Sequence, residues 1–370
     1  MPVEWPRTVV MSTEVPLDTI NGVNNALKNL FPLFTQKGID VLIHSPHPKK
    51  GFKLPLYPGV RFALGFPSLF NEITDNKRDV AVHAWAPFTL GFWLLDWADE
   101  NHIPRVASFN TNIPKFLESY FTSFRYLNSI TKFAWFFFKS VHNMAQINLA
   151  PSDSVGSQMK EKRFKNVKTW TRGVDTELFN PEKRNDELRQ KLTDGHPEKS
   201  IILYVGRLAK EKNLERIQLL ISSLPQAQFV IVGDGPIKAD LENKFAFKNV
   251  KFTGFLEGEE LAEIYASSEI FLTPSLTEGF ANTVLEAFAS GLPVVCFDAP
   301  GIKELVRESG AGFLAKYDDW EELRDNLLKL LNSQEIRKDF GLLGRNYSKT
   351  MSWEKRFQEL LDFYRLLKKK

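Results

Sequence analysis

The sequence predicts an α/β protein made of two doubly wound units in tandem. Apolar runs of four to six residues alternate with longer segments of helical periodicity, which is the pattern of parallel strands covered by helices. A polar interval separates two such series. The length of 370 residues, 43% of them hydrophobic and 25% charged, agrees with two or three domains and argues against a disordered or fibrous chain.

The apolar runs define the strands of each series. In the first half the expected strands are Thr8–Met11, Val41–His44, Arg61–Leu64, Asp79–His83, Arg105–Phe109 and Gln146–Ala150. In the second half they are Ile201–Val205, Gln228–Val232, Val250–Thr253, Ile270–Thr273 and Pro293–Phe297. Helical patterns lie between many of these runs, so both sheets are expected to be parallel.

The polar interval predicts the domain boundary. Phe179-Asn180-Pro181 and the run Glu182–Asp194 interrupt the alternation, so we expect an N-terminal domain over 1–181 and a C-terminal domain over 182–352. A last amphipathic helix, over 353–370, is expected to pack back on the first domain. Ligands of open α/β folds bind at the carboxyl ends of the strands, where we therefore look for the chemistry.

The charge is unevenly divided along the chain. The formal net charge is +3, but 19 Lys and Arg face 13 Asp and Glu up to Trp170, against 29 and 32 in the remainder. A basic first half predicts an anionic partner. Nucleic acid is a poor candidate, because the excess is modest and no recognised binding module is present.

The single cysteine and the chain termini bear on the compartment. Cys296 alone excludes a disulfide framework and a multi-cysteine zinc or iron–sulfur site, which favours the cytoplasm. The first residues have neither a basic nor an apolar signal region, so no cleavage is expected. The longest strongly apolar stretch, 133–138, is far too short to cross a bilayer.

A glycine and two cations follow the first strand of the second series. Gly206 permits a tight turn, and Arg207 and Lys212 then project from a loop before a helix, which suits an anion such as a diphosphate. A solvated basic loop is the alternative. The next two strands end in Gly233-Asp234-Gly235-Pro236 and in Gly254-Phe255-Leu256, where structural turns are as plausible as close approach to a ligand.

The fourth strand of this series carries the strongest local signal. Glu278 lies in the loop after it, and Glu286 lies eight residues on in a helix whose amides begin near Phe280, Ala281 and Asn282. Carboxylates accept hydrogen bonds from vicinal hydroxyls, and helix amides bind phosphate. Four consecutive strand ends thus carry residues suited to parts of a nucleotide-diphosphate sugar.

These motifs resemble glycosyltransferase family 4, whose GT-B fold has two facing Rossmann-like domains with a central cleft. The resemblance covers nearly the whole chain. It implies Arg207 and Lys212 on the donor diphosphate, Glu278 on the hexose and Glu286 on the ribose, with the loop 254–256 beside the base. It also implies transfer with retention of configuration and no required metal or other cofactor, which agrees with the lack of any Asp-x-Asp triplet.

The first half contributes three more candidates. Gly22, the remaining glycine where family members have a pair, is expected to approach donor phosphate or acceptor, or else simply to start a helix. His83 is expected at a strand end facing the cleft, as a catalytic or a structural residue. Asn110 stands where related members usually have a histidine, and it cannot carry a proton or a positive charge.

Aromatic and basic residues between Asn110 and Asn143 indicate the acceptor. They include Phe133, Trp135–Phe138, Lys132 and Lys139, which suits an anionic membrane surface or, equally, a buried aromatic core. The arrangement is similar to the branch of sulfoquinovosyl-diacylglycerol synthases and lipid-directed α-mannosyltransferases.

We therefore expect a peripheral hexosyltransferase that uses a UDP- or GDP-linked sugar and a glycolipid or diacylglycerol acceptor. A soluble acceptor, a sugar-nucleotide epimerase and a non-enzymatic binding protein remain alternatives, and the oligomeric state stays open.

Overall fold

The computed structural model describes residues 5–17, 22–46, 52–54, 57–62, 77–85, 87–110, 127–246 and 248–368. The chain divides into two compact units. Met1–Arg172 and Trp353–Lys370 form the first unit, and Gly173–Ser352 form the second. Residues 173–181, which the sequence placed in the first domain, thus belong with the second unit.

The first unit holds a parallel six-stranded sheet of order β2-β1-β5-β6-β7-β8. Its strands are β1 (Thr8–Thr13), β2 (Asp40–His44), β5 (Val80–Trp85), β6 (Arg105–Ser108), β7 (Ile147–Ala150) and β8 (Val167–Thr169). The short β8 was not predicted because it has only one apolar residue. The expected strand 61–64 is corrected: β4 (Tyr57–Phe62) instead pairs antiparallel with β3 (Phe52–Leu54) in a separate hairpin, and residues 63 and 64 lie outside the described part.

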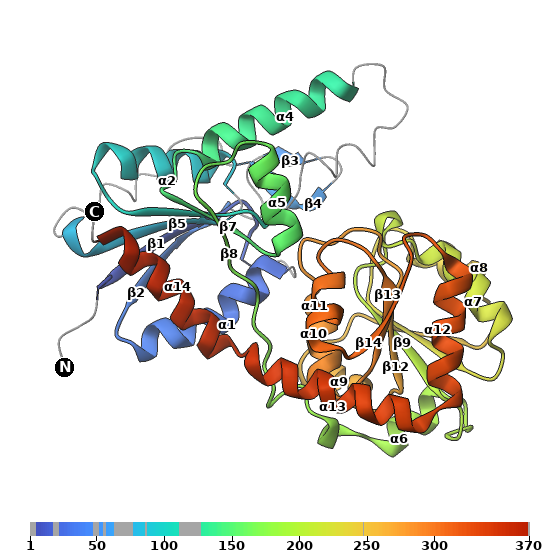
Figure 1. The fold of residues 1–370 in the computed structure, drawn as a ribbon. Helices are drawn as coiled ribbons and strands as arrows, with labels where there is room; N and C mark the ends of the chain where they lie inside the picture. The colour runs from blue at the N-terminus through green and yellow to red at the C-terminus, as the bar shows by residue number, and fades with distance from the viewer. Residues whose placement is uncertain are drawn as a thin grey trace. The chain divides into compact units, whose positions relative to one another are not determined.

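Alternating side chains of the first sheet enter two cores. Val9 and Met11 of β1 pack with helices α1 (Gly22–Gln36) and α14 (Trp353–Lys368), whereas Val10 packs with α2 (Thr89–Glu100). Figure 1 shows α14 lying along α1 at the sheet. Helices α4 (Leu127–His142) and α5 (Asp153–Glu161) complete this unit's main helices in the described part.

The second unit has a parallel sheet of order β11-β10-β9-β12-β13-β14. Its strands are β9 (Ile201–Val205), β10 (Gln228–Val232), β11 (Val250–Gly254), β12 (Ile270–Thr273), β13 (Val294–Phe297) and β14 (Gly312–Ala315). The order reverses between β9 and β12, which is the switch point where open α/β sheets bind ligands.

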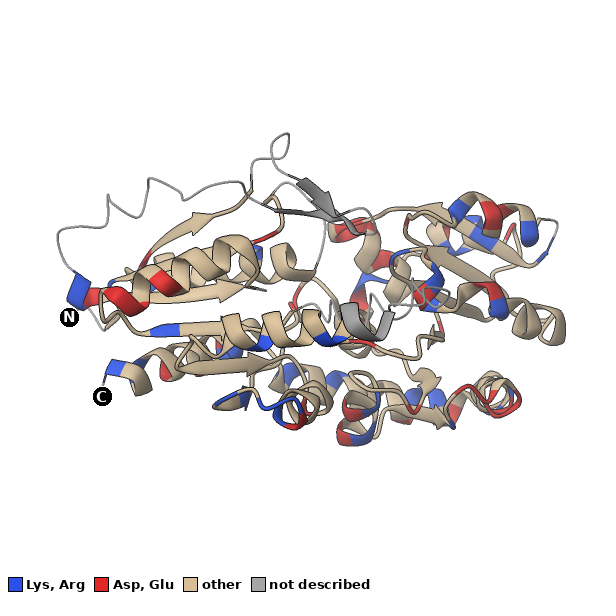
Figure 2. Cartoon of the chain, turned by 90° about the horizontal axis from the view of Figure 1, so that it is seen from above, with Lys and Arg blue, Asp and Glu red and all other residues tan. Residues whose placement is uncertain are grey.

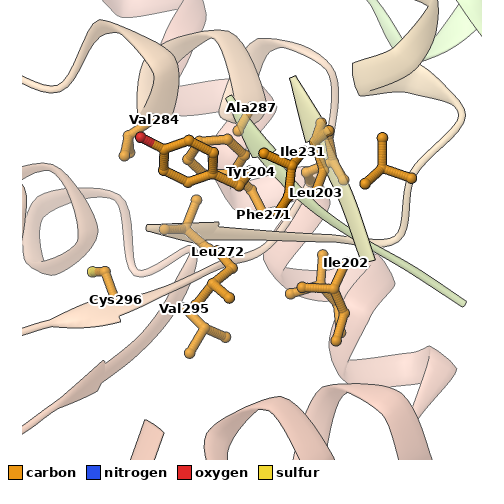
Figure 3. Packing of buried hydrophobic residues seen from close by; sticks show 14 of the residues in the cluster. Ile202, Leu203, Tyr204, Ile231, Phe271, Leu272, Val284, Ala287, Val295 and Cys296 are labelled. Carbon is orange, nitrogen blue, oxygen red and sulfur yellow. The ribbon is translucent and has the colours of Figure 1, made fainter. Parts of the chain in front are cut away.

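Helices alternate with these strands along the chain. They are α6 (Asp186–Leu192), α7 (Gln218–Ser223), α8 (Lys238–Lys244), α9 (Gly258–Ala266), α10 (Asn282–Ala289), α11 (Lys303–Ser309), α12 (Trp320–Asn332) and α13 (Gln334–Thr350). Figure 3 shows how buried side chains of β9, β12 and α10 pack in one core. Figure 2 shows Lys and Arg interspersed with Asp and Glu along the helices of this unit.

None of the described helices is long and apolar enough to span a membrane.

Candidate active site

A cavity of about 160 Å³ opens at the carboxyl ends of β9 and β12 in the second unit. Ligand pockets commonly measure about 300–1,000 Å³, so this cavity by itself matches a diphosphate or one sugar ring rather than a whole nucleotide sugar. It is lined by Tyr204, Val205, Gly206, Lys212, Thr273, Ser275, Glu278, Phe280, Ala281, Asn282 and Thr283. Six of the sequence-predicted residues therefore meet here: Gly206, Lys212, Glu278, Phe280, Ala281 and Asn282.

An ion pair crosses this cavity. Lys212 Nζ donates to Glu278 Oε1, and each side chain is about one fifth exposed, at 20% and 18%. Lys212 ends the short helix η4 (Lys210–Lys212), where Asn213 in a left-handed conformation turns the chain. Partial burial makes this pair stronger than a surface pair, and it leaves both groups beside space for a ligand.

Arg207 lies on the same loop but does not line the cavity. Its Nη2 donates to Glu211 Oε1, and its carbonyl oxygen accepts the Tyr204 hydroxyl at 3.2 Å. Tyr204 was not singled out from the sequence, because a tyrosine inside a strand looks like an ordinary core residue. Burial raises the pKa of Tyr204 well above its usual value, so the phenol stays neutral and holds the loop backbone.

The glycine-proline turn supports this loop rather than lining the cavity. A Cβ on Gly233 would lie 2.0 Å from the Gly206 carbonyl oxygen, so only glycine fits there. Leu208 N donates to Asp234 O at 2.8 Å, and Gly233 N donates to Gly254 O at 2.8 Å. The turn 233–236 therefore sets the position of the loop that carries Arg207 and Lys212.

The loop after β11 also lies away from the lining of the cavity. Gly254 ends β11, Phe255 is 44% exposed, and Leu256 packs at the edge of the core. Gly235, like Gly233, serves the turn: its Cβ would lie 2.3 Å from the Leu208 carbonyl oxygen. Donor binding by Gly235 and by the loop 254–256 stays a prediction.

Gly301 fixes the Glu278 loop and was not found from the sequence. Glu278 N donates to Pro300 O at 3.0 Å, and Ala281 N donates to Gly301 O at 3.2 Å. A Cβ on Gly301 would lie 2.3 Å from the Glu278 carbonyl oxygen, and its φ of +79° also favours glycine. A Pro-Gly pair is typical of many turns, so no signal in the sequence indicated that Gly301 contacts Glu278.

Helix α10 directs its first turn at the cavity. Ala281 precedes the helix and provides no side-chain cap. Ser275 Oγ and Asn282 Oδ1 are buried and have no hydrogen-bond partner among the described residues. The uncapped helix start favours an anionic group at this position, whereas the unpaired Asn282 oxygen and Ser275 hydroxyl suit ligand groups that donate hydrogen bonds, such as sugar hydroxyls.

Glu286 lies one turn further along α10, outside the cavity lining. Its Oε2 accepts the Tyr265 hydroxyl at 2.9 Å. Burial raises the pKa of Glu286 to about 7, although the hydrogen bond from Tyr265 opposes this rise. The carboxyl group therefore changes its charge near neutral pH.

His83 is placed differently from the sequence expectation. Strand β5 continues to Trp85, so His83 lies inside the strand and its side chain is fully buried. Nδ1 bonds the Tyr364 hydroxyl at 2.8 Å, and Nε2 bonds Ser108 Oγ at 2.7 Å. Burial and the nearby Arg172 lower the pKa of His83 to about 3, so the ring is a neutral link between sheet and α14.

Gly22 and Asn110 also belong to the first unit. Gly22 is exposed and begins α1, as the alternative interpretation of that turn expected. Asn110 follows β6 and accepts a hydrogen bond from Arg172 through its Oδ1. A neutral asparagine can accept from a neighbouring cation, whereas a protonated histidine would repel it.

Comparison with known proteins decides the family. Residues 20–178 match Glycosyltransferase Family 4, and residues 185–347 match Glycosyl transferases group 1. The sulfoquinovosyl transferase SQD2 of Arabidopsis thaliana is 32% identical over 94% of this chain and 71% of its own length. The chain belongs to the family 4 glycosyltransferases. It is accordingly an enzyme that transfers a hexosyl group.

Two further relatives share most of this glycosyltransferase's length. A GDP-mannose-dependent alpha-mannosyltransferase of Mycobacterium tuberculosis is 32% identical over 96% of both chains. The alpha-monoglucosyldiacylglycerol synthase of Acholeplasma laidlawii is 25% identical over 90% of both.

Solved structures confirm the expected GT-B fold of the glycosyltransferase. Sucrose-phosphate synthase from Thermosynechococcus elongatus aligns with a TM-score of 0.75 at 18% identity, covering 98% of this chain and 99% of that one. Anabaena HepE in complex with UDP aligns at 0.72 and 17% identity, covering 96% and 98%.

Proposed function

We propose that this glycosyltransferase transfers a hexose, with retention of configuration, from a UDP- or GDP-linked sugar to a hydroxyl group of a membrane lipid. The Lys212–Glu278 pair carries the proposal. A cation and a carboxylate meet beside the start of α10, where a diphosphate and a sugar hydroxyl would each find a partner. Donor binding then replaces the pair with separate contacts to the two parts of the donor.

Charge stabilisation is the main chemical task of this site. When the nucleoside diphosphate leaves, negative charge grows on its outer phosphate. Lys212 and the first amides of α10 border the cavity and would stabilise that charge, a preorganised effect that commonly supplies about 10²–10³-fold in rate for one donor group. Arg207 would add to it by exchanging Glu211 for the phosphate. We propose that these groups take the role of a divalent cation, so that transfer persists in the presence of a chelator.

A surface of α4 supports the lipid acceptor. Phe133 and Phe136 are 68% and 61% exposed, whereas Trp135 and Phe138 are buried in the core. Lys139 Nζ lies 5.7 Å from the Phe136 ring centroid, and Lys132 is exposed beside Phe133. Exposed aromatic rings next to lysines suit the headgroup region of an anionic membrane.

The names of two relatives also support a nucleotide-sugar donor and a lipid acceptor. The synthase of Acholeplasma laidlawii is named for monoglucosyldiacylglycerol, and the mannosyltransferase for GDP-mannose. These names support a nucleotide sugar as donor and a diacylglycerol-based acceptor for this chain.

Transfer from labelled UDP- and GDP-hexoses to lipid in vesicles tests the proposal. Wild-type protein should form a labelled lipid whose anomeric configuration matches that of the donor, with or without EDTA. Lys212→Met should lower the rate about 10²–10³-fold. Lys210→Met, an exposed lysine on the same short helix, is the matched control and should leave the rate unchanged.

Other products would indicate other functions. A labelled water-soluble glycoside would indicate a soluble acceptor, and an altered sugar nucleotide without transfer would indicate an epimerase. If no donor raises the thermal midpoint and none turns over, the nucleotide-sugar site itself is refuted.

A further inference from the structure

A buried arginine at the end of the first sheet has no carboxylate partner among the residues that the structure describes. Arg172 follows β8, is only 5% exposed, and packs against two indole rings that contact each other edge to face. Its guanidinium carbon is 5.1 Å from the ring centroid of Trp85 and 5.2 Å from that of Trp170. With Asn110, whose Oδ1 accepts from Nη2, these residues form what we call the Arg172 cluster.

The positive charge of this cluster is not neutralised within the described chain. Burial lowers the pKa of Arg172 to about 10, which still leaves the guanidinium charged at neutral pH. Glu14, the buried acid at the end of β1, is engaged elsewhere: Oε1 accepts Phe88 N and Gly91 N, each at 3.0 Å. Stacking on indole rings offsets part of the cost of burying a cation but does not remove its charge.

The cluster also contains donors that lack acceptors. Among the described residues, Arg172 Nη1, Asn110 Nδ2 and Trp85 Nε1 are buried and have no hydrogen-bond partner. All three carry hydrogen, and they come from the ends of β5, β6 and β8. Buried polar groups are nearly always paired in folded proteins, so a set made only of donors around a cation points to a missing acceptor with negative charge.

We propose that the Arg172 cluster binds an oxyanion, a phosphate or a carboxylate. Arg172 would donate to it through Nη1, and Asn110 and Trp85 would donate beside it. Asn110 is half-buried, so the cluster reaches the surface at this side chain. The binding of an anion here does not depend on the proposed function. The assignment of this anion to the acceptor substrate does rest on it.

An asparagine-to-aspartate substitution supplies the missing charge from within the protein. In Asn110→Asp the carboxylate pairs with Arg172, so the thermal midpoint without added anion should rise and the site should no longer take an ion. The midpoint is measured in sodium phosphate, in sodium acetate and in sodium chloride of equal ionic strength. Asn25→Asp, on the exposed side of α1, is the charge-matched control.

The test compares the anion-induced rise in thermal midpoint between wild type and the variants. Phosphate stabilises proteins in general and has a second candidate site near Lys212, but both effects act equally on wild type and variants. We expect phosphate or acetate to raise the midpoint more in wild type and Asn25→Asp than in Asn110→Asp. An equal rise in all three, or a lower midpoint of Asn110→Asp without anion, overturns the proposal.

Arg172→Met keeps the inference falsifiable if the aspartate variant fails to fold. Its uncharged side chain fills similar space, and it should lose the extra phosphate or acetate response. Persistence of that response would overturn the site. A charge-assisted contact of this kind commonly changes affinity about 10–100-fold.

Flotation with vesicles identifies the source of the anion. Phosphatidylcholine vesicles are compared with and without phosphatidic acid, using wild type and Asn110→Asp. A lost preference for phosphatidic acid in the variant assigns the site to a lipid headgroup. An unchanged preference with a lost response to free phosphate assigns it to a soluble anion, and no difference in either measurement overturns the proposal. Sugar transfer is assayed separately, so either idea can fail alone.

Discussion

Replacing Gly301 by alanine tests whether the loop after β13 sets the position of Glu278. The new Cβ would lie 2.3 Å from the Glu278 carbonyl oxygen, whereas ordinary contacts begin near 3.4 Å. The Glu278 loop must therefore move by about 1 Å, and a displacement of this size can cost about 10²-fold in rate. The clash and the φ of +79° together should cost about 2–4 kcal/mol in stability.

Gly195→Ala separates the clash from the backbone strain. Gly195 has a φ of +83°, but a Cβ at this position would meet nothing within 4 Å, so only the strain of about 1–2 kcal/mol applies. Transfer kinetics and the affinity for UDP and GDP are measured for both variants, together with thermal midpoints. We expect Gly301→Ala to lose about 10²-fold in kcat/KM and Gly195→Ala to keep wild-type kinetics. Equal kinetics in the two variants would refute the role given to Gly301.

Three further predictions concern other parts of the chain. The family resemblance implies that Glu286 contacts the ribose, and its pKa is raised to about 7, so nucleotide affinity should increase roughly tenfold from pH 6 to pH 8 as the carboxylate forms. This dependence should vanish in Glu286→Gln. A flat wild-type profile in calorimetric titrations would contradict the prediction. His83→Phe leaves the hydroxyls of Ser108 and Tyr364 without their partner, so the free energy of unfolding, measured by denaturant titration, should fall by about 2–4 kcal/mol. The transfer rate of the folded enzyme should stay the same. Lost activity at unchanged stability would instead indicate a catalytic role for His83. Phe133→Ser with Phe136→Ser should weaken flotation with anionic vesicles but leave soluble donor hydrolysis unchanged, and unaltered flotation would count against the α4 surface.

Strand periodicity predicted most of both sheets, since buried parallel strands are short apolar runs whatever their neighbours. In the second unit β9, β10 and β12 have the bounds that the sequence indicated. Strand β14 of this unit was not predicted, and β8 and β4 of the first unit are two further exceptions. Strand β8 is too polar to form a run, and β4 has a strand-like sequence but pairs outside the main sheet. Local pattern identifies a strand, but it does not identify the strand's partner.

Among the site residues, Lys212 and Glu278 were predicted from residue types at strand ends and from the family resemblance, and the structure places them in contact. Loop residues after parallel strands necessarily gather at one edge of the sheet, so this meeting followed from topology. The contacts that support these two residues did not follow from topology. Tyr204, Gly301 and Tyr265 act on the site through tertiary hydrogen bonds or close approach, and in the sequence they resemble an ordinary core residue or turn.

The sequence by itself determined the fold class, the family and the order of the donor-site motifs, because these depend on periodicity and on residue types at strand ends. Only the tertiary structure decided which polar groups are paired. It shows that His83 is a buried link, that the aromatic rings of α4 divide into core rings and exposed rings, and that Arg172 has no carboxylate partner in the described part of the chain. Pairing and burial depend on residues far apart in the chain, such as His83 and Tyr364, and no local pattern specifies such contacts.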